Sequence, residues 1–522
     1  MRWARDPVAV AILAAAAALR FWDLGRRSLW LDEAWAAVGC LDSPLDVAHV
    51  RHTPLLFAAM VRLSAAAFGR SEVAVRLPAT LFSLAAVVLV YRLGRDLVSR
   101  GAGVFAAAVV GLLPIPVYYG KELKPYSAEL FLALAVASLV QHLRQSPRSA
   151  AGWVGLVAIA LLGAGLGSVA LVLIAGALVV LLPVVRRSPV AYAGTVLGFG
   201  LAALAWVRLV FAPQVANEPE LMSYWRLFFL PHGPPRALAA AALQSGIEAT
   251  TWGLGNTLPH HNDSMLRLAT LAPAAACAVM GAMVVGAVHL VRRGAGWFVG
   301  LAVTWHLLVA GAALAGRYPY GPARIALFFL APTAIVLGAA ADGGASLVPS
   351  RVRPAGWCLL LVPLLWPLAG TWQENVAQPF EREELRPVLE AVFSQRRPGD
   401  RIWVSPGAVS AFRFYVPEPD AQVVLGGPGS DPGSVQASLR AAARGETRVW
   451  AIFGHRQAVE EPVAMLSLSR AQPLARIAAT GASAVLVTLP LPPPPNAPPA
   501  LRRPALADPQ SRVAAPGIEP GT

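Results

Sequence analysis

The chain has 522 residues, of which 56% are hydrophobic and 14% are charged, and its mean hydropathy is +0.56. A soluble protein of this length carries about twice that share of charged residues, so a water-soluble fold is excluded. The net charge of +14 does not indicate nucleic-acid binding. Most arginines form short clusters between apolar segments, as in the cytoplasmic loops of membrane proteins.

Eleven apolar segments are long enough, or nearly so, to cross a bilayer. The first, residues 7–22, has a basic start like a signal peptide, but no cleavage site follows and we expect it to be retained. The Gly-rich stretch 163–168 divides the apolar region 151–185 into two spans. The further predicted spans are 76–91, 101–118, 126–143, 153–166, 168–185, 189–211, 267–291, 297–315, 323–341 and 356–371.

Segment 54–69 is predicted to lie along the membrane surface as a juxtamembrane helix. It has Arg62 near its middle, where a charge in hydrocarbon costs roughly 2.5 kcal/mol or more. If it crossed, the arginine cluster at 92–100 and every later cluster would move outside, against the positive-inside rule. With the N-terminus inside, the outer face receives four loops and the region 372–522. The loops are 23–75, 118–127, 212–266 and 317–324.

Three parts of the chain are expected. Residues 1–371 form an α-helical polytopic membrane domain, and residues 372–488 form a small extracytoplasmic α/β domain. In the second part, the predicted helices EREELRPVLEAVFSQRR and VEEPVAMLSLSRA alternate with the predicted strands RIWVS and VWAIFG. Residues 489–522 are Pro-rich and are predicted to be a disordered tail.

Two adjacent acids, Asp32 and Glu33, follow the first span within SLWLDEAWAA. On composition alone, Asp32 is equally well explained as the N-cap of a helix starting at Glu33, between interfacial tryptophans. The functional alternative is a carboxylate at the membrane surface that acts as general base on an acceptor hydroxyl or amine. A cap would remain a compatible second role for Asp32.

Two further outer segments carry candidate binding residues. The loop YYGKELKPYS offers Lys121, Glu122, Lys124 and Tyr126, and its lysines could bind a phosphate, although such loops are usually solvated turns. RYPYGPAR carries Arg317 and Arg324 on the face that the positive-inside rule leaves poor in arginine, so a functional role is favoured there.

Other signals are weaker or absent. His260 and His261 lack a matching carboxylate motif, and we expect them to be structural. The three cysteines show neither a disulfide framework nor zinc spacing. No Walker or Rossmann motif is present, so cytoplasmic ATP is not the expected energy source. We expect no cofactor.

Taken in order, several of these segments resemble the family-39-like membrane glycosyltransferases of the GT-C fold, which include protein O-mannosyltransferases and lipid A aminoarabinose transferases. The resemblance covers about residues 7–420. It is carried by SLWLDEAWAA, HTPLLFAAMVRLSAAAFGRSEVAVRLPATLF, YRLGRDLVS, YYGKELKPYSAELF, RYPYGPARIALFFLAP and ELRPVLEAVFSQRRPGDRIWVSPGAVSAFRFY.

The resemblance implies a hexosyl- or pentosyltransferase of the cytoplasmic membrane, with its active site outside. It would take a sugar from a polyprenyl-phosphate carrier, and the acceptor is a protein, a lipid or a glycan. It makes Asp32 the base and Glu33 its support. The substrate-binding residues would be His52, Lys121, Glu122, Lys124, Tyr126, Arg317 and Arg324.

One departure from the family bears on metal binding. Relatives often carry an acid and two prolines before the juxtamembrane helix, whereas this chain has Arg51, His52, Thr53 and Pro54. One metal-coordinating acid is therefore missing, and we expect no metal requirement. The Ala, Arg, Gly and Pro bias is typical of a GC-rich bacterial source.

Three alternatives remain open at this point. A transporter or lipid flippase would show mid-membrane charges or repeated halves, and few such charges and no repeat are visible. An O-antigen ligase or polymerase would not be expected to carry the acid pair after the first span. A receptor-like scaffold would use its exported domain to bind a partner.

Overall fold

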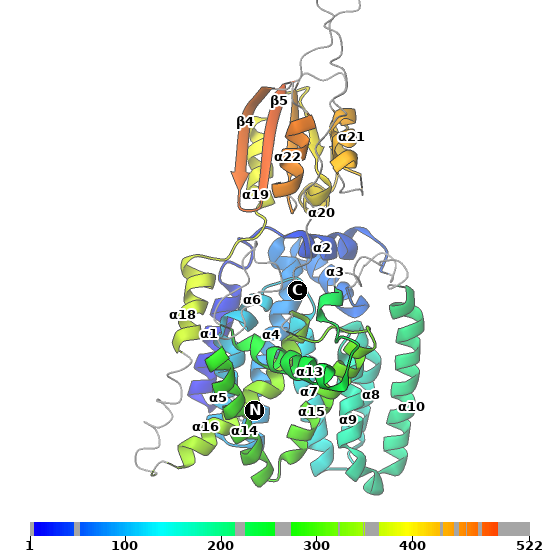
Figure 1. Cartoon of the computed structure of the whole chain (residues 1–522), viewed down its shortest axis with the longest axis vertical. Helices are drawn as coiled ribbons and strands as arrows, with labels where there is room; N and C mark the ends of the chain where they lie inside the picture. Colours follow the sequence, from blue (N-terminus) through cyan, green and yellow to red (C-terminus); the bar gives the residue numbers. More distant parts are fainter. Residues whose placement is uncertain are drawn as a thin grey trace, which may run out of the picture.

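The computed structural model describes residues 5–45, 53–213, 225–255, 273–321, 324–347, 349, 365–427, 432–442, 448–455, 457–467 and 472–488. A large helical body carries a smaller unit built on a β-sheet at one end (Figure 1). The predicted tail 489–522, His52, His260 and His261 lie outside the described residues.

The helical body begins with α1 (Pro7–Phe21), whose start is fixed by Asp6. The Asp6 carboxylate accepts from the backbone N–H of Val8 at 3.1 Å, and Pro7 occupies the first turn, where its missing N–H costs nothing. The following helices are α2 (Leu31–Asp42), α3 (Leu55–Phe68), α4 (Glu72–Leu97), α5 (Arg100–Leu112), α6 (Pro114–Tyr119), α7 (Tyr126–Gln145), α8 (Ala150–Leu162), α9 (Ala170–Val180), α10 (Pro189–Trp206), α13 (Pro235–Thr251), α14 (Pro273–Arg292), α15 (Gly296–Leu314), α16 (Leu330–Ser346) and α18 (Leu365–Trp372).

Among the described residues, six helices are long and apolar enough to cross a membrane. They are Glu72–Leu97, Tyr126–Gln145, Pro189–Phe211, Ala274–Arg292, Gly296–Leu314 and Arg324–Ser346. The predicted spans near 7–22, 101–118, 153–166 and 168–185 correspond to the shorter apolar helices α1, α5, α8 and α9. Most of predicted span 356–371 lies outside the described residues. A multi-pass helical body is therefore established, and the count of eleven spans stays a prediction.

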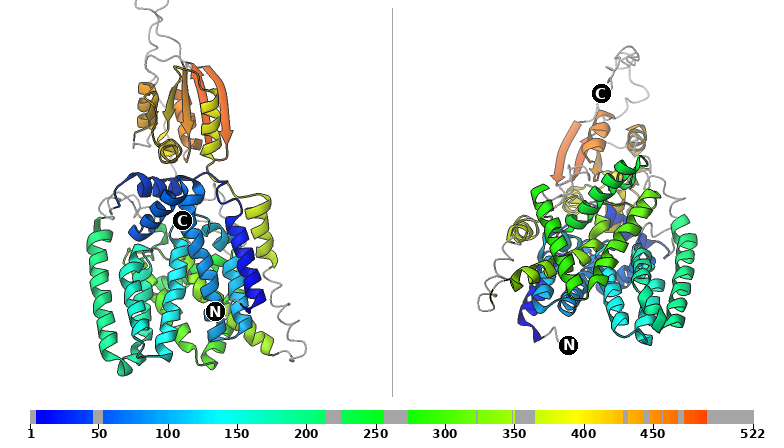
Figure 2. Two further views of the ribbon diagram at one scale, coloured as in Figure 1. Left: turned by 180° about the vertical axis from the view of Figure 1, so that it is seen from behind. Right: turned by 60° about the horizontal axis from the view of Figure 1, so that its bottom comes forward.

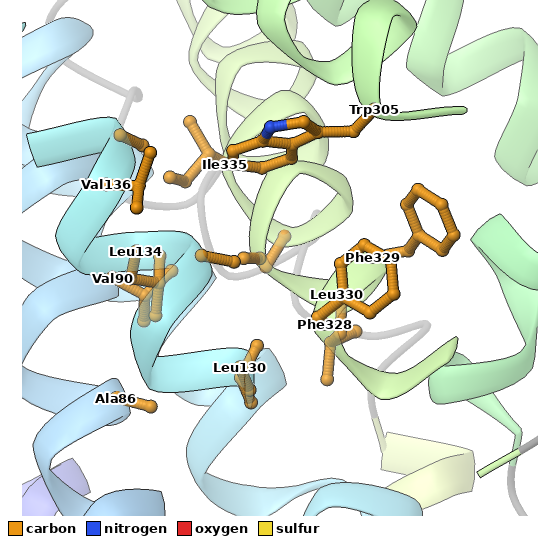
Figure 3. Close-up of a cluster of buried hydrophobic side chains, with 14 of the residues drawn as sticks. Ala86, Val90, Leu130, Leu134, Val136, Trp305, Phe328, Phe329, Leu330 and Ile335 are labelled. Carbon is orange, nitrogen blue, oxygen red and sulfur yellow. The ribbon is translucent and has the colours of Figure 1, made fainter. Parts of the chain in front are cut away.

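Small residues allow the central helices to pack closely. A side chain added at Gly103 would meet the backbone oxygen of Tyr91 at 2.5 Å, and one at Gly338 would meet that of Ala102 at 2.6 Å. Close backbone approach through such residues is typical of membrane helix bundles. Apolar side chains of the helical body also form a buried cluster (Figure 3). The cluster shown there includes Ala86, Val90, Leu130, Leu134, Val136, Trp305, Phe328, Phe329, Leu330 and Ile335.

The basic connections meet at the end of the body away from the sheet. Arg100 pairs with Asp6 at 2.7 Å, and Arg293 donates to the backbone oxygen of Val98 at 2.9 Å and to Asp342 at 3.1 Å. These contacts join the N-terminal end of α1 to the α4–α5 and α14–α15 connections and to the C-terminal part of α16. The arginine clusters of these connections therefore share one end of the bundle.

Helices α2 and α3 lie between the body and the sheet unit (Figure 1; Figure 2, left), where a juxtamembrane helix at 54–69 was predicted. Arg62 of α3 donates to the backbone oxygen of Cys40 at 2.7 Å and also to that of Ser43. Because carbonyl groups at a helix C-terminus carry partial negative charge, Arg62 caps α2. This contact explains how α3 accommodates its arginine.

The sheet unit contains five strands in the order β2-β1-β3-β5-β4. The strands are β1 (Arg401–Val404), β2 (Val423–Leu425), β3 (Arg448–Phe453), β4 (Gln472–Ala479) and β5 (Ala482–Thr488). β1 is parallel to β2 and β3, and β5 is antiparallel to β3 and β4. The accompanying helices are α19 (Leu385–Gln395), α20 (Val409–Tyr415), α21 (Pro432–Ala442) and α22 (Gln457–Ser467).

Alternating side chains of the strands cover both faces of this sheet. Ile402 and Val404 pack with α19 and α20, whereas Trp403 packs with α21 on the opposite face. Both predicted strands and both predicted helices of this unit are present, and the predicted small α/β domain is confirmed. The helical segment of α18 continues as a π-helix to Ala377 before the chain enters the sheet unit.

Candidate functional site

Asp32 lies in the first turn of α2, facing the helical body. Its carboxylate forms an ion pair with Arg324, the first residue of the 3-10 turn η8 (Arg324–Phe329). The helix begins at Leu31 and its N-cap is Trp30, with no side-chain capping hydrogen bond. The N-cap interpretation of Asp32 is therefore wrong, because the helix starts two residues earlier than predicted and the carboxylate turns toward Arg324.

The electrostatic environment of Asp32 is strongly positive. Burial raises the pKa of Asp32, but the charges of Arg324, Lys124, Arg382 and His455 together bring that pKa below its usual value. The carboxylate is thus ionised near neutral pH. Two of its four cationic neighbours come from the C-terminal part of the chain. Arg382 precedes α19, and His455 follows β3.

Glu33 points into the protein and has a different set of partners. Arg76 of α4 donates to both of its oxygens, at 2.8 and 2.7 Å, and the Leu123 backbone N–H donates to the first at 2.8 Å. Glu33 and Arg76 are 2% and 1% exposed. Burial raises the pKa of Glu33, and the charge and hydrogen bonds of Arg76 overcome that effect and lower it. Glu33 therefore fixes α2 and the loop before α7 to α4.

Glu122 is buried beside this cluster without a hydrogen-bond partner. Neither of its carboxylate oxygens has one among the described residues, and the side chain is 1% exposed. Burial raises the pKa of Glu122; the charge of Arg382 acts against this, and that of Glu33 adds to it. An unsatisfied buried carboxylate is costly, which makes it a candidate for contact with a bound molecule.

The other predicted residues of the 118–127 loop separate in space. Lys124 is one of the cations acting on Asp32. Tyr126, at the start of α7, is buried and packs its ring against Tyr119 with centroids 5.6 Å apart. Lys121 is not among the cations that act on Asp32: burial and then the charges of Arg27 and Arg76 lower its own pKa to about 7.

The segment before η8 is anchored by Tyr320. Its hydroxyl lies 2.9 Å from Nδ1 of His306 in α15, and its backbone N–H donates to the oxygen of Phe228 at 2.8 Å. These contacts hold the backbone that leads to Arg324. Arg317, at the other end of the same segment, is exposed and has no ion pair with any residue in the described ranges. Of the two predicted arginines, only Arg324 reaches Asp32.

Sequence reasoning missed the residues contributed by the sheet-bearing end. The guanidinium of Arg382 lies 4.2 Å from the ring centroid of Trp30, and that of Arg324 lies 5.2 Å from the same centroid. Nδ1 of His455 lies 2.6 Å from Glu383. A signal for Arg382 was available: it follows the last apolar segment on the predicted outer face, where the positive-inside rule makes arginine uncommon.

The sheet unit is joined to the loop that carries Asp32 by several hydrogen bonds. Glu383 accepts from the backbone N–H of Leu31 at 2.9 Å, and Glu384 accepts from that of Ser28 at 2.9 Å. Arg386 donates to Glu72 at 2.6 Å. The sheet unit therefore helps to position the start of α2 and, with it, Asp32.

This geometry gathers an ionised carboxylate with several cations in a largely dehydrated place. The cations of such a site suit an anionic ligand. The carboxylate suits a role as proton acceptor. Within the described ranges no group of three or more His, Cys, Asp or Glu side chains is placed to hold a metal ion.

Comparison with known proteins gives two kinds of match. The sequence model of the family described as dolichyl-phosphate-mannose-protein mannosyltransferase matches residues 52–209. Among solved structures, ArnT from Cupriavidus metallidurans bound to undecaprenyl phosphate aligns with a TM-score of 0.56 and 14% identity, over 92% of this chain and 97% of that chain. Apo ArnT aligns over the same shares with a TM-score of 0.53 and 15% identity. No curated protein matches the sequence significantly.

These matches bear on two predictions. The likeness to ArnT confirms a helical GT-C-like membrane fold with a small C-terminal sheet domain. The family match confirms the resemblance to the protein O-mannosyltransferases that the ordered segments indicated.

Proposed function

We propose that this chain is a membrane glycosyltransferase that moves a sugar from a polyprenyl-phosphate carrier to an acceptor. The observation that carries the proposal is the Asp32–Arg324 pair within a cationic cluster. The family match and the undecaprenyl phosphate bound by a structure of the same fold support a lipid-linked donor. The long carrier tail would lie between helices in the bilayer.

The proposed reaction is an inverting single displacement at the anomeric carbon. Asp32 takes the proton of the acceptor hydroxyl or amine, and the freed oxygen or nitrogen forms a bond to that carbon. The bond from the anomeric carbon to the phosphate oxygen breaks, and the polyprenyl phosphate leaves with the electron pair. Arg324 and Lys124 stabilise the negative charge that grows on the phosphate.

The pairing of Asp32 with Arg324 suggests how the donor prepares the base. A carboxylate whose pKa is held low is a weak base. A donor phosphate would share the Arg324 guanidinium, because arginine binds phosphate with paired hydrogen bonds. The attraction between Arg324 and Asp32 would then weaken, and the pKa of Asp32 would rise toward a more useful value for proton transfer.

We place this reaction at the outer face of the cytoplasmic membrane. The arginine clusters lie at the end of the body opposite the sheet unit, which the positive-inside rule assigns to the cytoplasm. Residues 1–371 would then form the catalytic membrane domain, and residues 372–488 an extracytoplasmic domain. The acceptor is a protein, a lipid or a glycan. The transporter alternative is not favoured, because neither match is to a transporter.

The proposal is tested with purified protein in liposomes. Labelled polyprenyl-phosphate sugars are added with candidate acceptors, and free polyprenyl phosphate is measured. Carrier release that depends on an acceptor is expected. Movement of the intact labelled lipid between leaflets without carrier release would support a flippase instead and would contradict the transferase.

A further inference from the structure

Arg382 enters the site from the segment that links the helical body to the sheet unit. Its guanidinium is half-buried and lies 4.2 Å from the ring centroid of Trp30, 5.3 Å from that of Tyr118 and 5.7 Å from that of Phe380. Three aromatic rings therefore hold one cation. Such contacts favour a guanidinium electrostatically and fix its plane.

The N–H groups of Arg382 are free for another partner. The guanidinium has five N–H donors, and none of them makes a hydrogen bond or ion pair with a residue in the described ranges. The neighbouring arginines differ in this respect, because Arg324 pairs with Asp32 and Arg386 pairs with Glu72. Ring contacts stabilise the charge of Arg382 without using its donors.

The charges near Arg382 leave room for an anion. Asp32 and Glu122 provide two carboxylates, against the three cations Arg324, Arg382 and Lys124. The cluster therefore has a surplus of one positive charge when both acids are ionised, and of two when Glu122 is protonated. The ion pairs Glu33–Arg76 and His455–Glu383 lie outside this count, because each pairs an acid with its own basic partner. A phosphate group would balance this surplus.

We propose that Arg382 binds the phosphate of the lipid-linked donor, so that the segment leading into the C-terminal sheet unit supplies part of the substrate site. This inference rests on the proposed function and adds a residue to it. Arg382 and Arg324 lie 4.2 and 5.2 Å from the centroid of the same Trp30 ring, and both guanidinium groups have the N–H donors that suit a phosphate. The phosphate also relieves the repulsion between these two cations.

A purely structural role for Arg382 is less consistent with its contacts. The polar contacts that join the sheet unit to the body are made by other residues, including Glu383, Glu384 and Arg386. Replacing Arg382 should therefore leave the unit in place and alter the binding of anions. The two roles predict different results in a binding experiment.

The experiment measures binding of undecaprenyl phosphate and of undecaprenol to the full-length protein in detergent. We expect wild type to bind the phosphate more tightly than the alcohol. Arg382→Gln should weaken phosphate binding by about 10-fold or more, because a charge-assisted pair of hydrogen bonds is lost. Binding of the alcohol and the melting temperature should not change. Arg382→Lys should bind the phosphate with intermediate affinity, because it keeps the charge without the paired geometry.

Arg413→Gln is the matched control, since Arg413 is an exposed arginine of the same unit. Phosphate binding by this variant should equal that of wild type. If wild type does not prefer the phosphate over the alcohol, the proposed donor is wrong. If wild type shows the preference and Arg382→Gln keeps it in full, only the role of Arg382 is wrong. If Arg382→Gln does not fold, Arg382→Lys decides, and wild-type phosphate affinity in that variant would contradict the proposal.

Discussion

At the scale of single residues, Asp32 and Glu33 are neighbours in the chain with opposite surroundings. Asp32 pairs with Arg324 within a cluster of cations, whereas Glu33 is fixed by Arg76 and the backbone of Leu123. The sequence singled out the acid pair Asp32 and Glu33. The family resemblance then predicted that Asp32 is the base and that Glu33 supports it. It did not predict Arg76 or Arg382 as partners, because no local spacing links residues 43 or more positions apart.

Glu33→Gln should destabilise the protein, although the proposed base Asp32 is unchanged. The change leaves the Arg76 guanidinium buried without its counter-charge, and breaking a buried pair from one side costs about 3–5 kcal/mol. The melting temperature in detergent should fall clearly. Glu33→Gln combined with Arg76→Met should recover part of the loss. Equal melting temperatures for wild type and the single variant would contradict the structural role of Glu33.

Lys121→Met should stabilise the protein in a pH-dependent way. The pKa of Lys121 is lowered from 10.5 to about 7, so the folded protein loses this proton at lower pH than the unfolded chain. The contribution of Lys121 to the free energy of unfolding of the wild type should therefore become more favourable as the pH rises from about 7 to 10.5. The advantage of the methionine variant should be largest below pH 7 and shrink above it. Melting curves across this range measure the effect, and a constant difference would contradict it.

At the scale of elements, most helices and strands follow from apolar periodicity and strand-like residues, and α2 is the element whose environment decides the site. Its predicted start was wrong by two residues, because Trp30 in extended conformation replaces a side-chain cap. The juxtamembrane helix α3 caps α2 through Arg62. The docking of the sheet unit onto the same loop could not be predicted, because it depends on side chains more than 300 residues apart.

Arg386→Met should loosen the sheet unit from the helical body. Arg386 donates to Glu72 at 2.6 Å and to the backbone oxygens of Gly25 and Arg26 at 3.1 and 2.7 Å. Without these contacts, limited proteolysis between α18 and α19 should become several-fold faster. Arg397→Met, an exposed change on the same unit, should not alter the cleavage rate. Unchanged cleavage in Arg386→Met would show that other contacts alone hold the unit.

At the scale of the whole molecule, the basic clusters and the charged site lie at opposite ends of the helical body. The apolar and basic pattern of the sequence predicted this arrangement, since alternating helices return each connection to one of two faces. The number of crossings is harder to predict, because several helices, including α5 and α9, are shorter than a full span.

The orientation of the molecule can be measured by cysteine labelling in intact cells. In a chain whose three native cysteines are replaced by serine, Arg397→Cys should react with an impermeant maleimide. Arg187→Cys, exposed in the connection between α9 and α10, should react only after the cells are opened. The reverse pattern would place the site at the cytoplasmic face and contradict the proposed orientation.

The central claim is that Asp32 is the base of a sugar transfer from a lipid-linked phosphate donor. The most direct measurement compares wild type with Asp32→Asn for acceptor-dependent release of polyprenyl phosphate from labelled donors. We expect the variant to retain its melting temperature within a few degrees and to bind undecaprenyl phosphate, but to lose transfer by at least about 100-fold, as for loss of a general base. Turnover equal to wild type in the folded variant would contradict the assignment.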